Sequence, residues 1–113
     1  MTGLELDVLR AGSQAVVSAH GAIDISTARV LRERLVELVS EGVRDVVLNL
    51  QGAAYVDAAG VDVAVRAYKL LSAHGGDFSI VCPHDHIRKL FDVSDLSDAF
   101  AIYPTVEDAT GRR

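Results

Sequence analysis

The chain has 113 residues, a length that favours one domain built around one hydrophobic core. Its formal net charge is −5, and no cluster of Lys and Arg stands out against this acidic background, which argues against direct binding of DNA or RNA. Cys82 is the single cysteine, so no intramolecular disulfide can form, and a cytoplasmic, reducing location is expected. A signal peptide pattern and an apolar stretch of the ~20 residues needed to cross a bilayer are both absent, so no membrane insertion is expected.

The first third of the chain predicts a β-hairpin followed by an amphipathic helix. Apolar and polar residues alternate over residues 4–8, and a second short apolar run covers residues 15–19, as expected of two strands joined by a turn. Ser26 or Thr27 can cap the helix that follows, in which apolar residues recur at helical spacing, and Gly42 is well placed to end it. This part of the chain is therefore expected to fold as β-β-α.

The rest of the chain predicts alternating strands and helices. Residues 43–50 are apolar on both faces, which is typical of a central strand in a covered sheet. After a linking segment over 51–56, the patterns predict a helix over 59–74, a strand over 78–82, a short helix over 85–91, an edge strand over 100–103, and a last short helix opened by Pro104, with a frayed tail within 105–113. The order β-β-α-β-α-β-α-β-α predicts an α/β fold, with about four helices packed on a mixed, mostly parallel sheet of four or five strands. Residues 1–113 are expected to form a single domain.

The segment from Cys82 to His86 is the best local candidate for a metal site. It contains Cys82, His84 and His86, which are side-chain types that bind zinc, but a site needs three or four donors that converge. A polar turn between a strand and a helix, with Asp85 as the helix cap, explains the same residues and is favoured. We therefore expect no metal and no cofactor.

No catalytic pattern emerges from the sequence. There is no G-x-S-x-G motif and no glycine-rich phosphate loop. Cys82 ends an apolar strand and is expected to be buried and inert. The protein is therefore not expected to be an enzyme.

The tetrapeptide Asp57-Ala58-Ala59-Gly60 lies where the central part of the chain turns into a helix. Asp57 can accept hydrogen bonds from the first free N–H groups of this helix, and Gly60 allows close packing, which is a purely structural interpretation. The helix that follows carries more apolar residues than one buried face requires. Two explanations remain open, a surface for a partner and coverage by neighbouring helices.

The chain resembles the STAS-domain anti-sigma factor antagonists of bacteria, also called anti-anti-sigma factors. The resemblance covers nearly the whole length and rests on the order and spacing of several segments. They are Gly21-Ala-Ile-Asp24, Val46-Val-Leu-Asn-Leu50, Tyr55-Val-Asp57-Ala-Ala-Gly60, Tyr68-Lys69, Gly75-Gly76 and Lys89-Leu-Phe91-Asp-Val-Ser-Asp-Leu96, in which Asp95 stands where glycine is common. The resemblance implies the STAS fold.

The resemblance also implies a partner-switching mechanism that regulates transcription. Members bind an anti-sigma factor that is also a serine kinase of the GHKL type, which frees a sigma factor. The kinase then phosphorylates the serine that follows the loop aspartate, and the complex separates. The family pattern D-S-[ST]-G is here Asp57-Ala58-Ala59-Gly60, so this loop has no phosphate acceptor. An engineered replacement and natural divergence both remain open, and two alanines favour divergence because one would suffice to remove the acceptor.

The resemblance implies a set of partner-binding residues, with Ala58 at the position of the phosphorylated serine. They are Asp24, Asp57, Ala58, Ala59, Gly60, Val61, Asp62 and Val65. Asp24 is expected beside the others because parallel connections bring such loops to one end of the sheet. The alternatives are a STAS subunit of another assembly, such as a lipid-transport ATPase complex or a stress-sensing scaffold, and a small-ligand or metal sensor that uses the region of His84. A weak homodimer also remains open.

Overall fold

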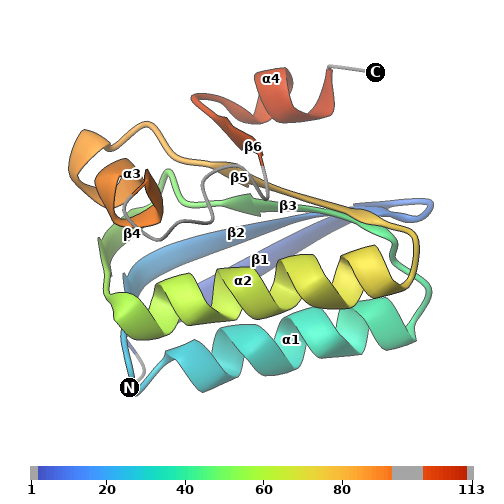
Figure 1. The fold of residues 1–113 in the computed structure, drawn as a ribbon, viewed down its shortest axis with the longest axis horizontal. Helices are drawn as coiled ribbons and strands as arrows, with labels where there is room; N and C mark the ends of the chain where they lie inside the picture. Colours follow the sequence, from blue (N-terminus) through green and yellow to red (C-terminus); the bar gives the residue numbers. More distant parts are fainter. Residues whose placement is uncertain (1–2, 93–100, 112–113) are drawn as a thin grey trace.

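The computed structural model describes residues 3–92 and 101–111 (Figure 1). In chain order the described elements are β1 (Leu4–Ala11), β2 (Gln14–Ile23), α1 (Ala28–Ser40), β3 (Asp45–Asn49), β4 (Ala53–Val56), α2 (Ala58–Ala73), β5 (Asp77–Val81), α3 (Asp85–Asp92), β6 (Ala101–Tyr103) and α4 (Val106–Thr110). Figure 1 shows α1 and α2 side by side on one face of the sheet, with α4 on the opposite face. Ser94, Asp95 and the other residues of the 93–100 segment lie outside the described residues.

The described strands form one mixed sheet in the order β1-β2-β3-β5-β6, with β4 paired to β2. The hairpin of β1 and β2 is antiparallel, and the remaining pairs are parallel. The predicted fold class is confirmed. The sheet has six strands, however, so the predicted number of four or five strands is wrong. The additional strand is β4, in the segment 51–56 that was expected to link a strand to a helix. Its four residues are too few to show a strand period, and the turn at Leu50–Gly52 separates it from β3.

Strand β2 is longer than the predicted run of residues 15–19, and it continues to Ile23. The reason is the pairing with two different neighbours: β3 pairs with its first half, and β4 pairs with its last residues. The backbone N–H of Gly21 donates to the carbonyl of Gly52 at 3.0 Å, where the pairing with β4 begins. The loops that follow β2 and β4 are thereby brought to the same end of the sheet.

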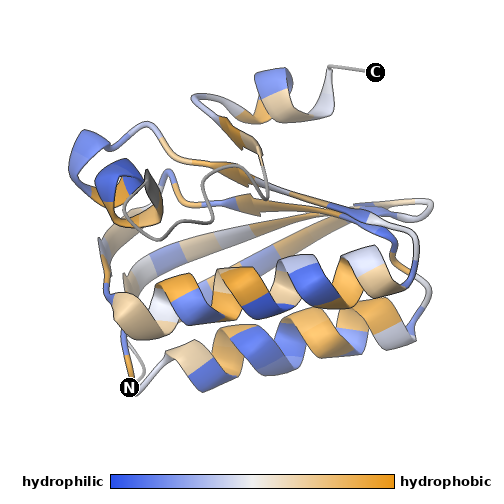
Figure 2. Cartoon of the chain, in the orientation of Figure 1, coloured by the Kyte–Doolittle hydropathy of each residue, from blue (hydrophilic) through white to orange (hydrophobic). Residues whose placement is uncertain are grey.

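The two long helices bury one side each against the sheet. Figure 2 shows hydrophilic and hydrophobic residues alternating along both helices, as expected of elements with one covered side. The extra apolar residues of α2 include Val61, Val65 and Tyr68, which are half-buried and pack against the core. Much of the apolar surplus predicted for this helix is thus covered by neighbouring elements.

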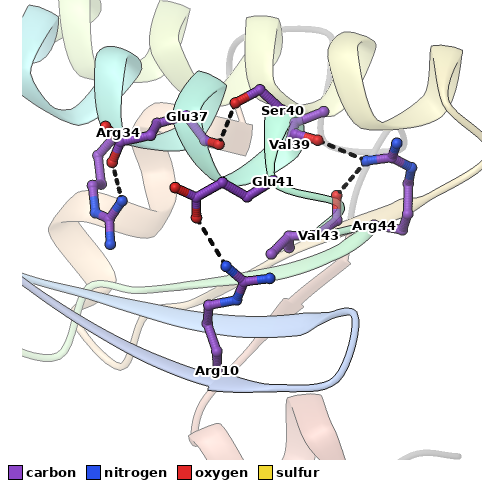
Figure 3. A network of polar contacts seen from close by, with 8 residues as sticks. All are labelled: Arg10, Arg34, Glu37, Val39, Ser40, Glu41, Val43 and Arg44. Atoms are coloured by element: carbon purple, nitrogen blue, oxygen red, sulfur yellow. Dashed lines mark hydrogen bonds and ion pairs between the residues drawn. The ribbon is translucent and has the colours of Figure 1, made fainter.

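Polar contacts tie the C-terminal end of α1 to the sheet (Figure 3). Arg44 donates hydrogen bonds to the carbonyl oxygens of Val39 at 2.9 Å and Val43 at 2.8 Å. Arg10 of β1 forms an ion pair with Glu41 at 2.8 Å. Carbonyl groups at the end of a helix lack partners within the helix, so these contacts satisfy some of them. They lie at the opposite end of α1 from the loop that joins it to β2.

The last described helix begins at Val106, two residues after Pro104, which was expected to open it. Thr105 is the N-cap of α4, and its hydroxyl oxygen accepts a hydrogen bond from the N–H of Asp108 at 3.1 Å. A threonine side chain can satisfy a free N–H group of the first turn, which proline cannot do. Buried Ala109 of α4 packs in a second small core with Val47 and Val81 of the sheet.

Candidate functional site

Asp57 caps the N-terminus of α2, as the sequence predicted. Its backbone is extended, and its Oδ1 atom accepts hydrogen bonds from the N–H groups of Ala59 at 2.8 Å and Gly60 at 3.3 Å. The backbone N–H of Asp57 donates to the carbonyl of Ile23 at 3.1 Å. The loop is therefore held at both ends, by the helix that it opens and by the end of β2.

Gly60 is buried where the first turn of α2 packs against the ends of β2 and β4. A Cβ atom at this position would lie 2.7 Å from Cγ1 of Val56 and 3.0 Å from Cγ2 of Ile23, which are both shorter than ordinary contacts. The prediction that Gly60 allows close packing is confirmed. Because it is buried, its part in the site is to shape the loop.

Asp24 lies beside the Asp57 loop. Ile23 and Val56 are register partners in the parallel strands β2 and β4, so the residues that follow them, Asp24 and Asp57, leave the sheet next to each other. Each aspartate precedes one of the two long helices. The expected proximity of Asp24 to the loop is therefore found, although the segment that creates it, β4, was not predicted.

Asp24 also organises its own loop. Its Oδ1 atom accepts hydrogen bonds from the Ser26 hydroxyl at 2.6 Å, from the Ser26 N–H at 2.9 Å and from the Thr27 N–H at 3.1 Å. These hydrogen bonds, that of the Ser26 hydroxyl foremost, hold the pKa of Asp24 below its ordinary value of 3.8. The carboxylate is therefore charged at neutral pH.

The predicted cap of α1 at Ser26 or Thr27 is wrong in its chemistry. Thr27 stands at the N-cap position, but its side chain makes no cap hydrogen bond. Its buried hydroxyl instead donates to the carbonyl of Ala22 at 2.8 Å. The carboxylate of Asp24, three residues earlier, accepts hydrogen bonds from the N–H groups of Ser26 and Thr27, which precede the helix.

The predicted partner-binding residues lie in the two adjacent loops and along the first half of α2, and they differ in exposure. Ala58 and Asp62 are exposed, and Asp24 and Asp57 are half-buried. The remaining members are Ala59, Val61 and Val65, which are half-buried, and Gly60, which is buried. Among the residues of the loop tetrapeptide and the first turn of α2, Ala58 is thus the most accessible to solvent.

The sequence prediction did not include Ile25, the most exposed large hydrophobic residue of the described chain. Its exposed fraction is 85%, and it lies between Asp24 and Ser26 in the loop beside the Asp57 loop. Tyr55 of β4 is a second exposed hydrophobic residue near this end, with an exposed fraction of 54%. The sequence feature that could have indicated Ile25 is an isoleucine in an otherwise polar turn, because exposure of an apolar side chain to water does not stabilise the free protein.

The residues around His84 do not converge on a metal site. Nε2 of His84 lies 2.9 Å from the carbonyl oxygen of Gln51, and the His84 and His86 ring centroids are 5.9 Å apart. Within residues 3–92 and 101–111, no group of three His, Cys, Asp or Glu side chains could hold a metal ion. Asp85 is the first residue of α3, where the sequence predicted this helix to begin, so it lies in the first turn and not at the N-cap position.

Two further observations concern the cysteine and the helices. Cys82 is buried, as predicted, and burial raises the pKa of its thiol, which disfavours the reactive thiolate. Among the helices of the described residues, none is long and apolar enough to cross a membrane.

Comparison with known proteins places these features in a family. Residues 5–109 match the family described as STAS domain. The anti-sigma-B factor antagonist of Bacillus subtilis (strain 168) is 31% identical over 99 residues, which cover 88% of this chain and 90% of that protein. The crystal structure of an anti-sigma factor antagonist from Mycobacterium paratuberculosis is 25% identical, covers 96% of this chain and 92% of its own, and superposes with a TM-score of 0.87.

A third relative shows the same fold at lower identity. The anti-sigma factor antagonist SpoIIAA in its unphosphorylated form is 21% identical, covers 96% of this chain and 94% of its own, and has a TM-score of 0.82. The fold, the family match along almost the whole chain and the similarity to the Bacillus subtilis protein agree with one another. The chain belongs to the STAS-domain family.

Proposed function

We propose that this protein is an anti-sigma factor antagonist, which binds an anti-sigma factor in the cytoplasm and thereby frees a sigma factor for transcription. The observation that carries the proposal is the pairing of β2 with β4, which sets the Asp24 and Asp57 loops side by side at one end of the sheet. The relatives named as anti-sigma factor antagonists support it. The protein acts by binding and not by catalysis.

The surface that these loops form suits protein recognition. Ile25 offers an exposed apolar side chain, and Ala58 is small and exposed, so a partner can approach the loop closely. Asp24 adds negative charge beside them. An exposed apolar residue with charged neighbours is typical of the centre and rim of an interface. The partner is expected to present an apolar pocket with basic groups beside it.

The partner in this proposal is a serine kinase of the GHKL type, as in the family mechanism. That kinase finds no acceptor in this loop, because Ala58 and Ala59 have no hydroxyl group. A phosphate on residue 58 would add about −1.5 to −2 charges at neutral pH beside Asp57 and Asp24, and it would place this charge against the apolar pocket of the partner. Release of the partner therefore depends on affinity and concentration and not on modification of residue 58.

The proposal can be tested with the purified protein and its partner. Affinity capture from the source cell, followed by calorimetry with the purified anti-sigma factor, should show a complex that displaces the sigma factor. Ala58→Glu should weaken this binding at least about tenfold, because truncating or blocking a central interface contact commonly costs that much. Ala73→Glu is the matched control, since Ala73 is an exposed alanine at the other end of α2.

Two results would contradict the proposal. Recovery of a transport ATPase in place of any anti-sigma factor would favour a STAS subunit of another assembly. Equal binding of the anti-sigma factor by Ala58→Glu, Ala73→Glu and the unchanged protein would show that the loop surface is not the interface.

A further inference from the structure

A groove runs between α1 and α2 on the side of the two helices that faces away from the sheet. It consists of two adjoining hollows of about 230 Å³ and about 150 Å³, which share Arg32 and Val63 as lining residues. The smaller hollow reaches Ala28 and Ala59, at the end of the helices next to the Asp24 and Asp57 loops. The groove therefore continues from the loop surface along the two helices, which lie side by side in Figure 1.

The larger hollow is mainly apolar and partly open to solvent. It is lined by Leu35 and Val36 of α1 and by Val63, Ala67 and Leu70 of α2. Val36 has an exposed fraction of 50%, which makes it one of four exposed large hydrophobic residues among those described. Apolar surface of this kind at the edge of a candidate interface favours contact with another protein.

One positive charge in the groove finds no partner among the residues that the structure describes. Arg29 pairs with Glu33 at 3.3 Å, and Arg66 pairs with Asp62 at 2.7 Å, so their charges are balanced on their own helices. Arg32 lines both hollows, and within the described parts of the chain no hydrogen bond or ion pair to it is found. An unmatched guanidinium beside apolar surface, in a chain of net charge −5, calls for a carboxylate from outside the molecule.

We infer that the groove binds an amphipathic helical segment of the anti-sigma factor, with apolar side chains in the two hollows and a carboxylate opposite Arg32. The inference rests on the proposed function for the identity of the partner. The groove extends along α2 from Ala59 to Leu70, which is ~16 Å or about three helical turns at 1.5 Å per residue. A ridge of side chains from a third helix fits between two helices that lie side by side.

Other occupants fit the groove less well. Each hollow alone is smaller than the roughly 300 Å³ at which pockets for drug-sized ligands begin, and the groove that joins the two is long and narrow, which suits a row of side chains better than a compact small molecule. A second copy of this chain would meet the groove with the same surface in a twofold dimer. That surface offers Arg32 again, while its acidic residue Asp62 is already paired with Arg66.

The test compares three variants of the full chain in calorimetry with the purified anti-sigma factor. Arg32→Gln and Val36→Asp should each weaken binding about tenfold. The first removes the positive charge that faces the partner's carboxylate, and the second removes an apolar contact in the larger hollow. Arg34→Gln should bind like the unchanged protein: it also removes one positive charge from α1, but Arg34 pairs with Glu37, as Figure 3 shows, and lies about 200° around the helix from Arg32. Thermal unfolding of each variant shows whether it is folded.

The outcomes separate this inference from the proposed function. If Ala58→Glu weakens binding while Arg32→Gln and Val36→Asp bind normally, the groove inference is wrong and the function stands. If the unchanged protein binds no anti-sigma factor, the proposed function is wrong. A designed peptide of three helical turns then tests whether the groove binds an amphipathic helix. This peptide carries leucines four residues apart and one glutamate, and it should shift the amide signals of α1 and α2 in the nuclear magnetic resonance spectrum more than its glutamine analogue does.

Two further results in these experiments would overturn the groove inference. One is the absence of any shift in α1 and α2 with the designed peptide when the anti-sigma factor also fails to bind. The other is a concentration-dependent dimer in sedimentation that Val36→Asp abolishes, because a second copy would then occupy the groove.

Discussion

The capping role of Asp57 gives a stability change that can be worked out from the structure. Asp57→Ala removes the acceptor of two hydrogen bonds, from Ala59 N–H at 2.8 Å and from Gly60 N–H at 3.3 Å. Replacing such an N-cap by alanine costs about 1 kcal/mol, within a range of roughly 0.5–2 kcal/mol. The second bond is long, so we expect a loss near the middle of that range. For a domain of about this size, 1 kcal/mol lowers the melting temperature by roughly 4–8 °C.

Two further substitutions separate the cap from the charge. Asp57→Asn and Asp57→Ser keep an oxygen that can accept from the helix N–H groups, and asparagine and serine cap helices about as well as aspartate. Both variants should therefore remain within roughly 0.5 kcal/mol of the unchanged protein in urea unfolding followed by circular dichroism, with the same dependence on urea. The reasoning is refuted if Asp57→Ala is as stable as the unchanged protein, or if Asp57→Asn loses as much as Asp57→Ala.

Three other predictions follow from the same end of the molecule. Gly60→Ala should destabilise the fold by up to about 2 kcal/mol in urea unfolding, because overpacking costs roughly 1–3 kcal/mol and the better helix propensity of alanine returns about 1 kcal/mol; a more stable variant would contradict the close contact. Ser26→Ala should raise the pKa of Asp24 in a carboxyl titration, since the Ser26 hydroxyl is the main cause of its lowering. Because the pKa of Asp24 is lower in the folded than in the unfolded protein, the ionised carboxylate stabilises the fold at pH values above the unfolded pKa. This stabilisation is lost as pH falls through the native pKa, so the Ser26→Ala variant should lose less stability on acidification than the unchanged protein. With the cognate kinase and ATP, Ala58→Ser should take up phosphate at residue 58 and the unchanged protein should not, as mass spectrometry would show.

The long elements of the fold follow from local sequence. Helices α1 and α2 have apolar residues at helical spacing over 13 and 16 residues, and the strands β3 and β5 are short apolar runs. A period of 3.6 or 2 residues is a property of the chain itself, so these elements are visible before any tertiary contact is known. The cap at Asp57 belongs to the same class, because the capping carboxylate and the N–H groups that it accepts from are within three residues.

The family was also accessible from the sequence, because the segments that carry the resemblance occur in the right order along the chain. The order of the loop tetrapeptide and the absence of a hydroxyl group at Ala58 need no coordinates. What these segments do in space, however, depends on which strand pairs with which.

The tertiary structure alone decided the arrangement of the site. Strand β4 has four residues and exists as a strand because it pairs with the last part of β2, more than thirty residues earlier in the chain. That pairing sets Asp24 beside Asp57 and leaves Ile25 exposed next to them, and no local pattern encodes it. The groove that Arg32 lines likewise exists only because α1 and α2 lie side by side. Periodicity and capping are local and can be seen in the sequence, whereas strand pairing and helix packing join distant segments and are decided only when the whole chain folds.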